Sequence, residues 1–333
     1  MKRSILPLLI SASASLLPLG VHGASPLLRE TQRIELPGVG GRIDHMALDI
    51  ANKKLFVAAL GNNTVEVVDL GAGRVGKRLS GFQEPQGVLL VPELKRLVVT
   101  NGESAFAQIF DSNTLDPVGR VELRDDGDNI RYAPETQRAY VGCGKGRDSA
   151  LAVLDMKTDA MLSNVQLSGH PESFQLEAKG NRIFVNVPTA QAIEVVDRSG
   201  GNVVASWPLP ARNNFPMALD EAHGRLFVGT RSPAQFIVVD TSSGSVVATL
   251  DSVRDADDIF YDGGMHRIYV SGGEGFVFVF EQLDMDHYRL AGKIQTRLGA
   301  RTSLYVQEWK TLFVALPGSS GKTAEIRSYI ALP

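Results

Sequence analysis

The feature that most constrains the fold is a short β-rich segment that recurs seven times along the 333-residue chain. Its second residue stands at positions 55, 97, 139, 183, 226, 268 and 312, so that successive steps are 42, 42, 44, 43, 42 and 44 residues. The copies are KLFVAAL, RLVVTNG, RAYVGCG, RIFVNVP, RLFVGTR, RIYVSGG and TLFVALP. This regular period indicates a repeat architecture, in which each unit buries its surface against its neighbours.

Each copy lies inside a larger unit of four expected strands. An apolar segment and a tight turn precede it, as in GVLLVPELKR at 87–96, and an alternating segment that ends near an acid follows, as in TVEVVDL at 64–70. A fourth short strand completes the unit, as in SVVATL at 245–250. Alternation with period two and turns rich in Gly, Asn, Asp and Pro are typical of strands. We therefore predict an all-β protein, a seven-bladed β-propeller of four-stranded antiparallel blades.

The propeller is expected to occupy residues 24–333, and one blade is expected to be closed by the N-terminal part of the chain. The expected blades are roughly 42–81, 84–124, 127–168, 170–210, 214–251, 255–296 and 300–330. The last of these has three strands, whereas QRIELPG at 32–38 reads as one more strand before the first blade. We predict that residues 32–37 supply the missing outer strand, because such closure removes an exposed sheet edge.

The first 23 residues have the pattern of a cleavable signal peptide. Lys2 and Arg3 precede a long uncharged apolar run, and Val21-His22-Gly23 places small residues at the positions that precede a cleavage site. The alternative is an N-terminal membrane anchor, because the run just reaches the length of a short span. We expect an exported protein, periplasmic or secreted. Cys143 is the single cysteine, so an internal disulfide is impossible and stability must come from the core.

RLVVTNG at 96–102, followed in most repeats by a V-x-D strand, resembles the YVTN β-propeller repeat family and its YncE-like exported members. The resemblance extends over about residues 32–330. It implies the propeller fold but no particular activity, because this family hosts diverse roles.

A candidate site lies where the innermost strands begin. In a propeller these strands surround a central channel, so their entrances from all blades meet at one mouth. The segment DADDIFYD at 255–262 is one such entrance, with several carboxylates in front of a buried strand. The candidate ligand-binding residues at the seven entrances are Asp44, His45, Gln86, Asp128, Asn129, Glu172, Asn214, Asp257, Asp258 and Arg301. The alternative is that these side chains only contact channel water.

Two sharper hypotheses concern metal binding and catalysis. A divalent cation such as calcium would find oxygen ligands at Asp44, Asp128, Glu172 and Asp257, with Asn129 as a neutral ligand. A softer site of His45 with His170 is disfavoured, because these residues belong to blades on opposite sides of the ring.

In an enzyme, His45 would act as a general base and Arg301 would stabilise a developing anion. Apart from this pair, the sequence points to no catalytic residue. It contains no G-x-S-x-G motif, the signature of one class of serine hydrolase.

The favoured function is binding of a small polar or cationic ligand, or of a protein partner, at the channel mouth. The alternatives are a hydrolase or lyase resembling lactonases in architecture, and a non-catalytic docking scaffold. A formal net charge of −3 gives no general attraction for nucleic acid, so we expect no nucleic-acid partner. We also expect no membrane insertion after signal cleavage, and a monomer.

Overall fold

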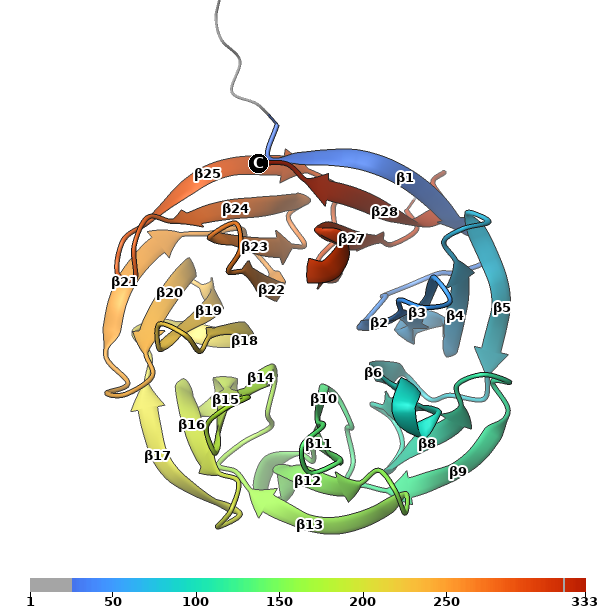
Figure 1. The fold of residues 1–333 in the computed structure, drawn as a ribbon, viewed down its shortest axis with the longest axis horizontal. Coiled ribbons are helices and arrows are strands. Elements are labelled where there is room, and N and C mark those ends of the chain that lie inside the picture. Colours follow the sequence, from blue (N-terminus) through green and yellow to red (C-terminus); the bar gives the residue numbers. More distant parts are fainter. Residues whose placement is uncertain (1–25, 320) are drawn as a thin grey trace, which may run out of the picture.

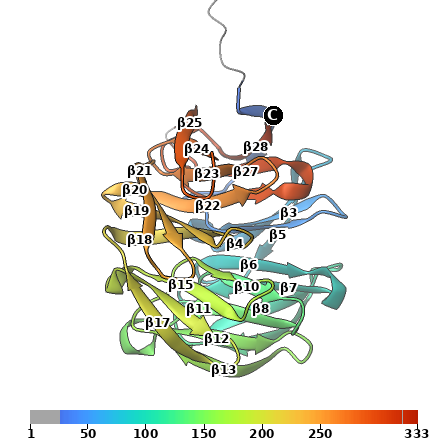
Figure 2. The ribbon, with the colours of Figure 1, turned by 60° about the vertical axis from the view of Figure 1, so that its left-hand side comes forward.

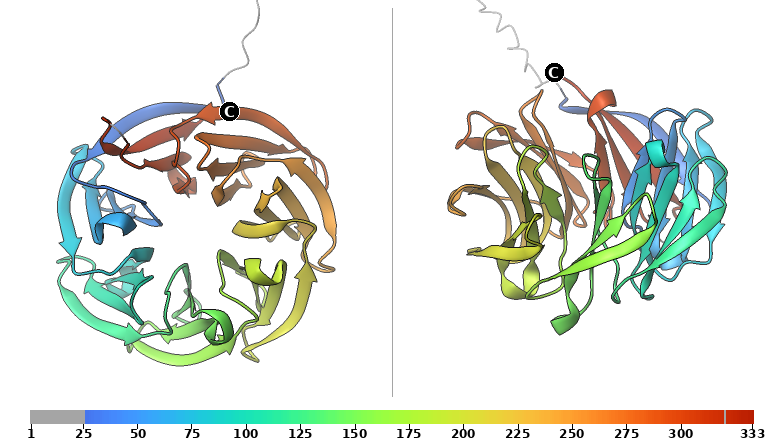
Figure 3. Two further views of the ribbon diagram at one scale, coloured as in Figure 1. Left: turned by 180° about the vertical axis from the view of Figure 1, so that it is seen from behind. Right: turned by 60° about the horizontal axis from the view of Figure 1, so that its bottom comes forward.

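The computed structural model describes residues 26–319 and 321–333, so the predicted signal peptide lies outside the described residues. These residues form seven four-stranded antiparallel sheets, arranged as blades in a ring (Figure 1). The prediction of an all-β, seven-bladed propeller is confirmed. Figure 2 shows the ring turned to one side, and Figure 3 shows it from behind and tilted.

The strands of each blade run in chain order from the inner to the outer edge of the ring, except in blade 7. Blade 1 contains β2 (Met46–Asp49), β3 (Lys54–Ala59), β4 (Thr64–Asp69) and β5 (Arg74–Ser80). Blade 2 contains β6 (Pro85–Val91), β7 (Arg96–Asn101), β8 (Phe106–Asp111) and β9 (Pro117–Glu122). Blade 3 contains β10 (Ile130–Ala133), β11 (Arg138–Cys143), β12 (Ala150–Asp155) and β13 (Ala160–Gln166).

The remaining blades continue around the ring. Blade 4 contains β14 (Phe174–Leu176), β15 (Arg182–Val187), β16 (Ala192–Asp197) and β17 (Asn202–Pro208). Blade 5 contains β18 (Arg212–Asp220), β19 (Arg225–Ser232), β20 (Ala234–Asp240) and β21 (Val246–Asp251). Blade 6 contains β22 (Ala256–Asp262), β23 (Arg267–Gly272), β24 (Phe276–Gln282) and β25 (Tyr288–Gln295). Blade 7 contains β26 (Ser303–Val306), β27 (Thr311–Leu316), β28 (Ala324–Ala331) and the N-terminal β1 (Leu28–Leu36).

The helices of the described residues are single 3₁₀ turns in connecting loops. They are η1 (Leu60–Asn62), η2 (Pro92–Leu94), η3 (Gly146–Asp148), η4 (Pro188–Ala190) and η5 (Gln307–Trp309). None of them has the length and apolar character that a membrane crossing requires.

The recurring β-rich segment forms the second strand of every blade and is buried on both faces. In β3, Leu55 and Val57 pack against blade 7, whereas Phe56 and Ala58 pack against blade 2. Alternating side chains of one strand therefore enter two different interfaces. The buried apolar residues form seven clusters, one at each interface between neighbouring blades.

The acid that ends the third strand in most repeats stabilises the following turn. The side chain of Asp111 accepts hydrogen bonds from the backbone N–H groups of Asn113 and Thr114, at 2.8 and 3.0 Å. These bonds hold the pKa of Asp111 below its usual range. The same arrangement recurs at Asp155, Asp197 and Asp240. The repeated V-x-D pattern thus marks a turn rather than a site.

The N-terminal strand closes the ring as the sequence predicted. β1 pairs antiparallel with β28, from Leu28 opposite Ala331 to Leu36 opposite Ala324. Compared with the expected strand 32–37, β1 begins four residues earlier and its last residue comes one position earlier. Ile34 and Leu36 enter the cluster between blades 7 and 1, so closure adds apolar burial to hydrogen bonding.

Replacing Ile34 by Ala is expected to lower the free energy of unfolding by about 2–4 kcal/mol, because it leaves a cavity at a fully buried position. Ile34 is 1% exposed, whereas the adjacent Glu35 points to solvent. Urea denaturation followed by circular dichroism measures the change, and Glu35→Ala is the matched control. Equal, small effects of both substitutions would contradict a stabilising role for β1.

Candidate functional site

The sheet register places one residue of each blade at an equivalent position just before the innermost strand. Met46 of blade 1 pairs with Val57, and Ile130 of blade 3 pairs with Val141 in the same way. In each blade, one residue lies two positions before the residue that is equivalent to Met46. We call these seven residues the entrance ring. Its members are Asp44, Gln86, Asp128, Glu172, Phe215, Asp257 and Arg301.

Six of the seven entrance-ring side chains line a cavity of about 380 Å³ at the channel mouth, which we call the vestibule. Asp44 lies beside it, in a small recess that it shares with His45, Asp128 and Asn129. The vestibule wall is completed by Arg231 of β19 and by loop residues. The loop residues are Arg42, Leu60, Glu84, Glu103, Asp126, Lys145 and His170. The structure therefore brings most of the predicted site residues together.

The four Arg and Lys side chains of the vestibule all form ion pairs. Arg42 contacts Asp44 at 2.7 Å, and Arg301 contacts Asp255 at 2.9 Å. Lys145 lies 3.4 Å from Asp125. Arg231 pairs with Asp257, and its guanidinium lies 3.7 Å from the ring centroid of Phe215. Their positive charge is therefore largely compensated within the protein.

Glu172 differs, because its carboxyl group has no hydrogen bond or ion pair to any residue in 26–319 or 321–333. Burial, together with repulsion from Asp128 and Asp257, raises the pKa of Glu172 well above its usual value. The vestibule carboxyl groups of Glu84 and Glu103 likewise lack an ion pair within the described residues. The vestibule thus offers acids without basic partners. Of the three, Glu172 and Glu84 are half-buried and Glu103 is exposed.

Below the vestibule, His45 is surrounded by three carboxylates, and we call these four residues the charged layer. The Nε2 atom lies 3.6 Å from Asp44 Oδ1 and 3.5 Å from Asp128 Oδ1, and Nδ1 lies 3.9 Å from Asp258 Oδ1. Burial alone would lower the pKa of His45, but the carboxylates outweigh it and raise the pKa to about 10. His45 is therefore an imidazolium at neutral pH.

This protonation state disfavours the predicted use of His45 as a general base, because an imidazolium has no lone pair to accept a proton. Arg301, its expected partner, pairs with Asp255 at the vestibule wall. The pKa of Asp258 is raised to about 7, mainly by burial. The charged layer is thus arranged to hold a buried positive charge at its centre.

The same atoms are the ones that could hold a metal ion. Asp44, His45 and Asp128 offer ligand atoms that all lie within 4.8 Å of one another. A cation there would take the place of the His45 proton, since both are held by the same carboxylates. Glu172 and Asp257, the other predicted oxygen ligands, are not part of this group. His170 instead contacts the Gly144 carbonyl at 2.7 Å, on the vestibule wall.

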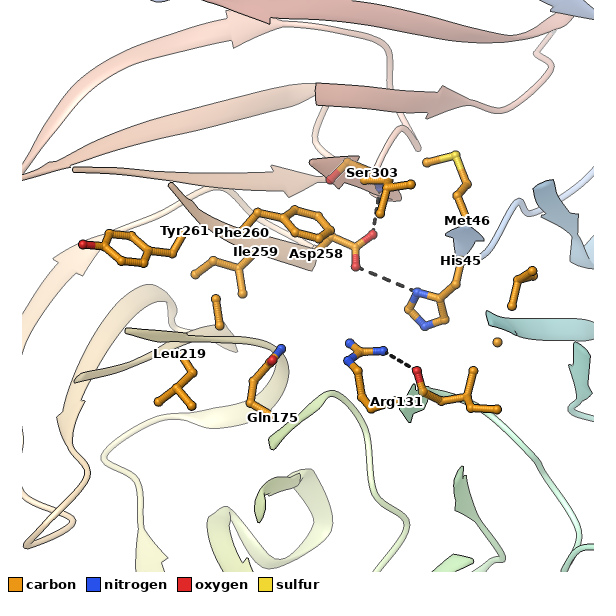
Figure 4. Close-up of a pocket in the computed structure, with 15 residues that line it drawn as sticks. His45, Met46, Arg131, Gln175, Leu219, Asp258, Ile259, Phe260, Tyr261 and Ser303 are labelled. Atoms are coloured by element: carbon orange, nitrogen blue, oxygen red, sulfur yellow. Dashed lines mark hydrogen bonds and ion pairs between the residues drawn. The ribbon is translucent and has the colours of Figure 1, made fainter. Parts of the chain in front are cut away.

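The other side of the charged layer faces a second cavity of about 380 Å³, which we call the inner cavity. Figure 4 shows His45, Asp258, Arg131 and Gln175 pointing toward its centre. Asp258 is held in place by the Ser303 backbone N–H at 2.8 Å. Apolar side chains from several innermost strands make up much of the remaining wall.

The remaining predicted residues have varied surroundings. The Gln86 amide donates to Asp126 Oδ1 at 3.1 Å and so links blades 2 and 3. Asn129 is buried beside the charged layer, and its Oδ1 lacks a hydrogen-bond partner among the described residues. Asn214 lies apart from the vestibule lining, because its amide donates to Asn186 Oδ1 at 2.9 Å and to the Ala192 carbonyl at 3.0 Å.

In blade 5 the entrance-ring position holds Phe215, two residues before Met217, and not the predicted Asn214. Counting back from the repeated strand would have identified it, since Met217 aligns with Met46. Sequence reasoning also missed Arg42, Arg231 and Arg131. Arg42 and Arg231 lie in segments already assigned to the mouth, but no sequence pattern indicated which carboxylates they contact.

No protein-family model matches this chain. The seven-bladed beta-propeller protein Rv1057 of Mycobacterium tuberculosis is 28% identical over 141 residues, which are 41% of this chain and only 36% of that protein. A solved chain of Kuenenia stuttgartiensis hydrazine synthase has a TM-score of 0.76 at 16% identity, covering 89% of this chain and 99% of that chain. A chain of the mitotic checkpoint complex has a TM-score of 0.76 at 12% identity, with 100% of both chains covered. The structural likenesses show the fold alone.

His45→Gln is expected to destabilise the metal-free protein at pH 6.5 by about 3 kcal/mol, because it leaves buried carboxylates without their cation. The folded pKa of about 10 exceeds the unfolded value near 6.5. The stability that His45 contributes is therefore complete below about pH 6.5 and is lost as the pH rises towards 10. Urea denaturation of both proteins between pH 6.5 and 10 should show the difference shrinking.

His223→Gln is the control for this experiment, because His223 is a half-exposed histidine paired with Asp220 at 2.8 Å. Its effect should be small at every pH. A melting temperature that falls on chelation and recovers with added calcium or zinc would contradict a proton at the centre of the charged layer.

Proposed function

We propose that this propeller binds a small polar ligand carrying a positive charge, such as a protonated amine, in the vestibule. The proposal rests on a difference between the basic and acidic side chains of the vestibule in whether they form ion pairs. The vestibule's Arg and Lys side chains are all ion-paired, whereas Glu84, Glu103 and Glu172 have no basic partner among the described residues. A buried carboxylate is stable when a cation or hydrogen-bond donor compensates it.

Glu172 is the residue best placed to contact the positive group. It lies on the entrance ring, lines both the vestibule and the recess beside the charged layer, and has no protein partner among the described residues. A volume of about 380 Å³ lies within the range of small-ligand sites. The ring of Phe215 is already covered by Arg231, so the carboxyl groups rather than an aromatic face supply the attraction.

We further propose that the protein is an exported member of the YVTN-repeat family. The support is the RLVVTNG segment, which contains all of β7, and the signal-peptide pattern of residues 1–23. A protein partner that inserts a lysine side chain into the vestibule would satisfy the same carboxyl groups. The experiment below separates the small ligand from this alternative.

Calorimetric titration with a panel of small primary amines, including putrescine, is expected to identify a ligand that Glu172→Gln weakens at least tenfold, or about 1.4 kcal/mol. Binding requires the charged carboxylate, so the affinity should fall as the pH is lowered through the raised pKa of Glu172. Glu122→Gln, which removes an exposed carboxylate on β9, is the control and should leave affinity unchanged.

The melting temperature of Glu172→Gln should equal or exceed that of the wild type, because the substitution removes a buried charge without a partner. If no amine of the panel binds, the small-ligand proposal is overturned. Equal binding by wild type and Glu172→Gln would overturn the role of the vestibule.

A further inference from the structure

Arg131 places a second unusual charge in the channel, on the opposite side of the charged layer from the vestibule. It belongs to the innermost strand β10, and Figure 4 shows its guanidinium directed into the inner cavity. Its one side-chain hydrogen bond goes from Nη1 to the adjacent Ile130 carbonyl, at 2.9 Å. Among residues 26–319 and 321–333 it has no ion-pair partner within 4.0 Å.

The repeat shows that this position does not require a cation. Arg131 pairs with Tyr140 of β11, and the register identifies the equivalent residue of each other blade. These residues are Ala47, Leu89, Gln175, Ala218, Phe260 and Leu304. Six neutral side chains therefore occupy the place that Arg131 occupies in blade 3. The arginine is a departure from the repeat rather than part of its packing.

The inner cavity offers Arg131 no direct ion pair. Asp258, the acidic residue of its lining, attracts the guanidinium from beyond 4.0 Å, but its oxygens face His45 at 3.9 Å and the Ser303 backbone N–H at 2.8 Å. Burial lowers the pKa of Arg131, so the surroundings disfavour its charge. The guanidinium carries five N–H donors in a planar fork that matches a carboxylate, and most of them remain free to face the cavity.

The other polar groups of the cavity wall already have protein partners. The Gln175 amide donates to the Met217 carbonyl at 2.7 Å, and the Ser303 hydroxyl shares a hydrogen bond with Ser271 at 2.8 Å. The Tyr261 hydroxyl donates to Gln282. The rest of the wall is largely apolar. It comprises Met46, Val88, Ile130, Ala218, Leu219, Ile259, Phe260 and Leu304. The cavity thus combines a cation that lacks an ion pair with a group of apolar side chains.

From this combination we infer that the inner cavity binds a small organic carboxylate with an apolar body, whose carboxylate pairs with the Arg131 guanidinium. The apolar chain or ring of the ligand lies against the aliphatic wall, and the cavity volume of about 380 Å³ suits a ligand of this size. This site is separate from the vestibule, because the charged layer lies between them and the two cavities attract opposite charges. It does not depend on the proposed amine ligand.

The test uses octanoate as the probe, with octylamine and octanol as cationic and neutral ligands of the same chain length. Calorimetric titration of the full chain is expected to show octanoate binding, at least tenfold weaker octanol binding, and no octylamine binding that Arg131→Gln changes. Arg131→Gln should weaken octanoate binding at least tenfold. Arg120→Gln, an exposed arginine on β9, should leave it unchanged. Glu172→Gln should also leave it unchanged, which keeps this result independent of the vestibule.

The stability of the variant separates a binding role from a structural one. Without ligand, Arg131→Gln should keep or raise the melting temperature, because it removes a buried charge without a nearby partner. A lower melting temperature together with unchanged octanoate affinity would overturn the proposal. Binding of inorganic phosphate but not octanoate would also overturn it, since the apolar wall would then have no role.

Discussion

Every blade of this protein must be covered on both faces, and this requirement determines the rest of the structure. The second and third strands place alternate side chains in two different interfaces, so a blade by itself would expose both sets to water. Blades arranged in an open row would leave one apolar face exposed to water at each end of the row. The ring avoids this only when blade 7 meets blade 1, and β1 holds them together through its pairing with β28 and through Ile34 and Leu36. Closure by β1 therefore covers the two faces that an open row of blades would expose.

The location of the core between the blades also explains why the channel can carry charged side chains. The apolar residues that stabilise the fold lie between blades, so the innermost strands contribute less to the core and can differ from blade to blade. Charged side chains in the channel are still partly removed from water and need compensation. Around His45 this is achieved by three carboxylates, and around Arg231 by Asp257 and the ring of Phe215. Glu172 and Arg131 are left without a near partner in the described part of the chain, and they lie on opposite sides of the charged layer.

The fold could be predicted from the sequence because the same strand pattern recurs in all seven repeats. Seven copies of the buried strand fix the blade number, and the V-x-D acids mark turns whose geometry is local. It also placed most entrance residues correctly at the mouth, since their position depends only on distance from the repeated strand. Contacts between blades were not accessible in this way. That Arg231 pairs with Asp257, or that Asp258 of blade 6 faces His45 of blade 1, depends on side-chain directions that no periodicity records. Asn214 was chosen for its polarity, whereas the position two residues before Met217 belongs to Phe215.

In a protein of equivalent blades, the repeat itself provides the reference against which a functional residue can be recognised. A residue that recurs at one position in all blades serves the common architecture, as the buried valines of the second strands do. A residue that appears in a single blade, where the others carry neutral side chains, is not required by that architecture. Arg131 meets this criterion on the inner side of the channel. Phe215 meets it in the opposite sense, as an apolar residue in a polar ring, and its stacking with Arg231 keeps that arginine directed at Asp257. A departure from the repeat is therefore one guide to a candidate binding position, and a charge without a partner, as at Glu172, is another.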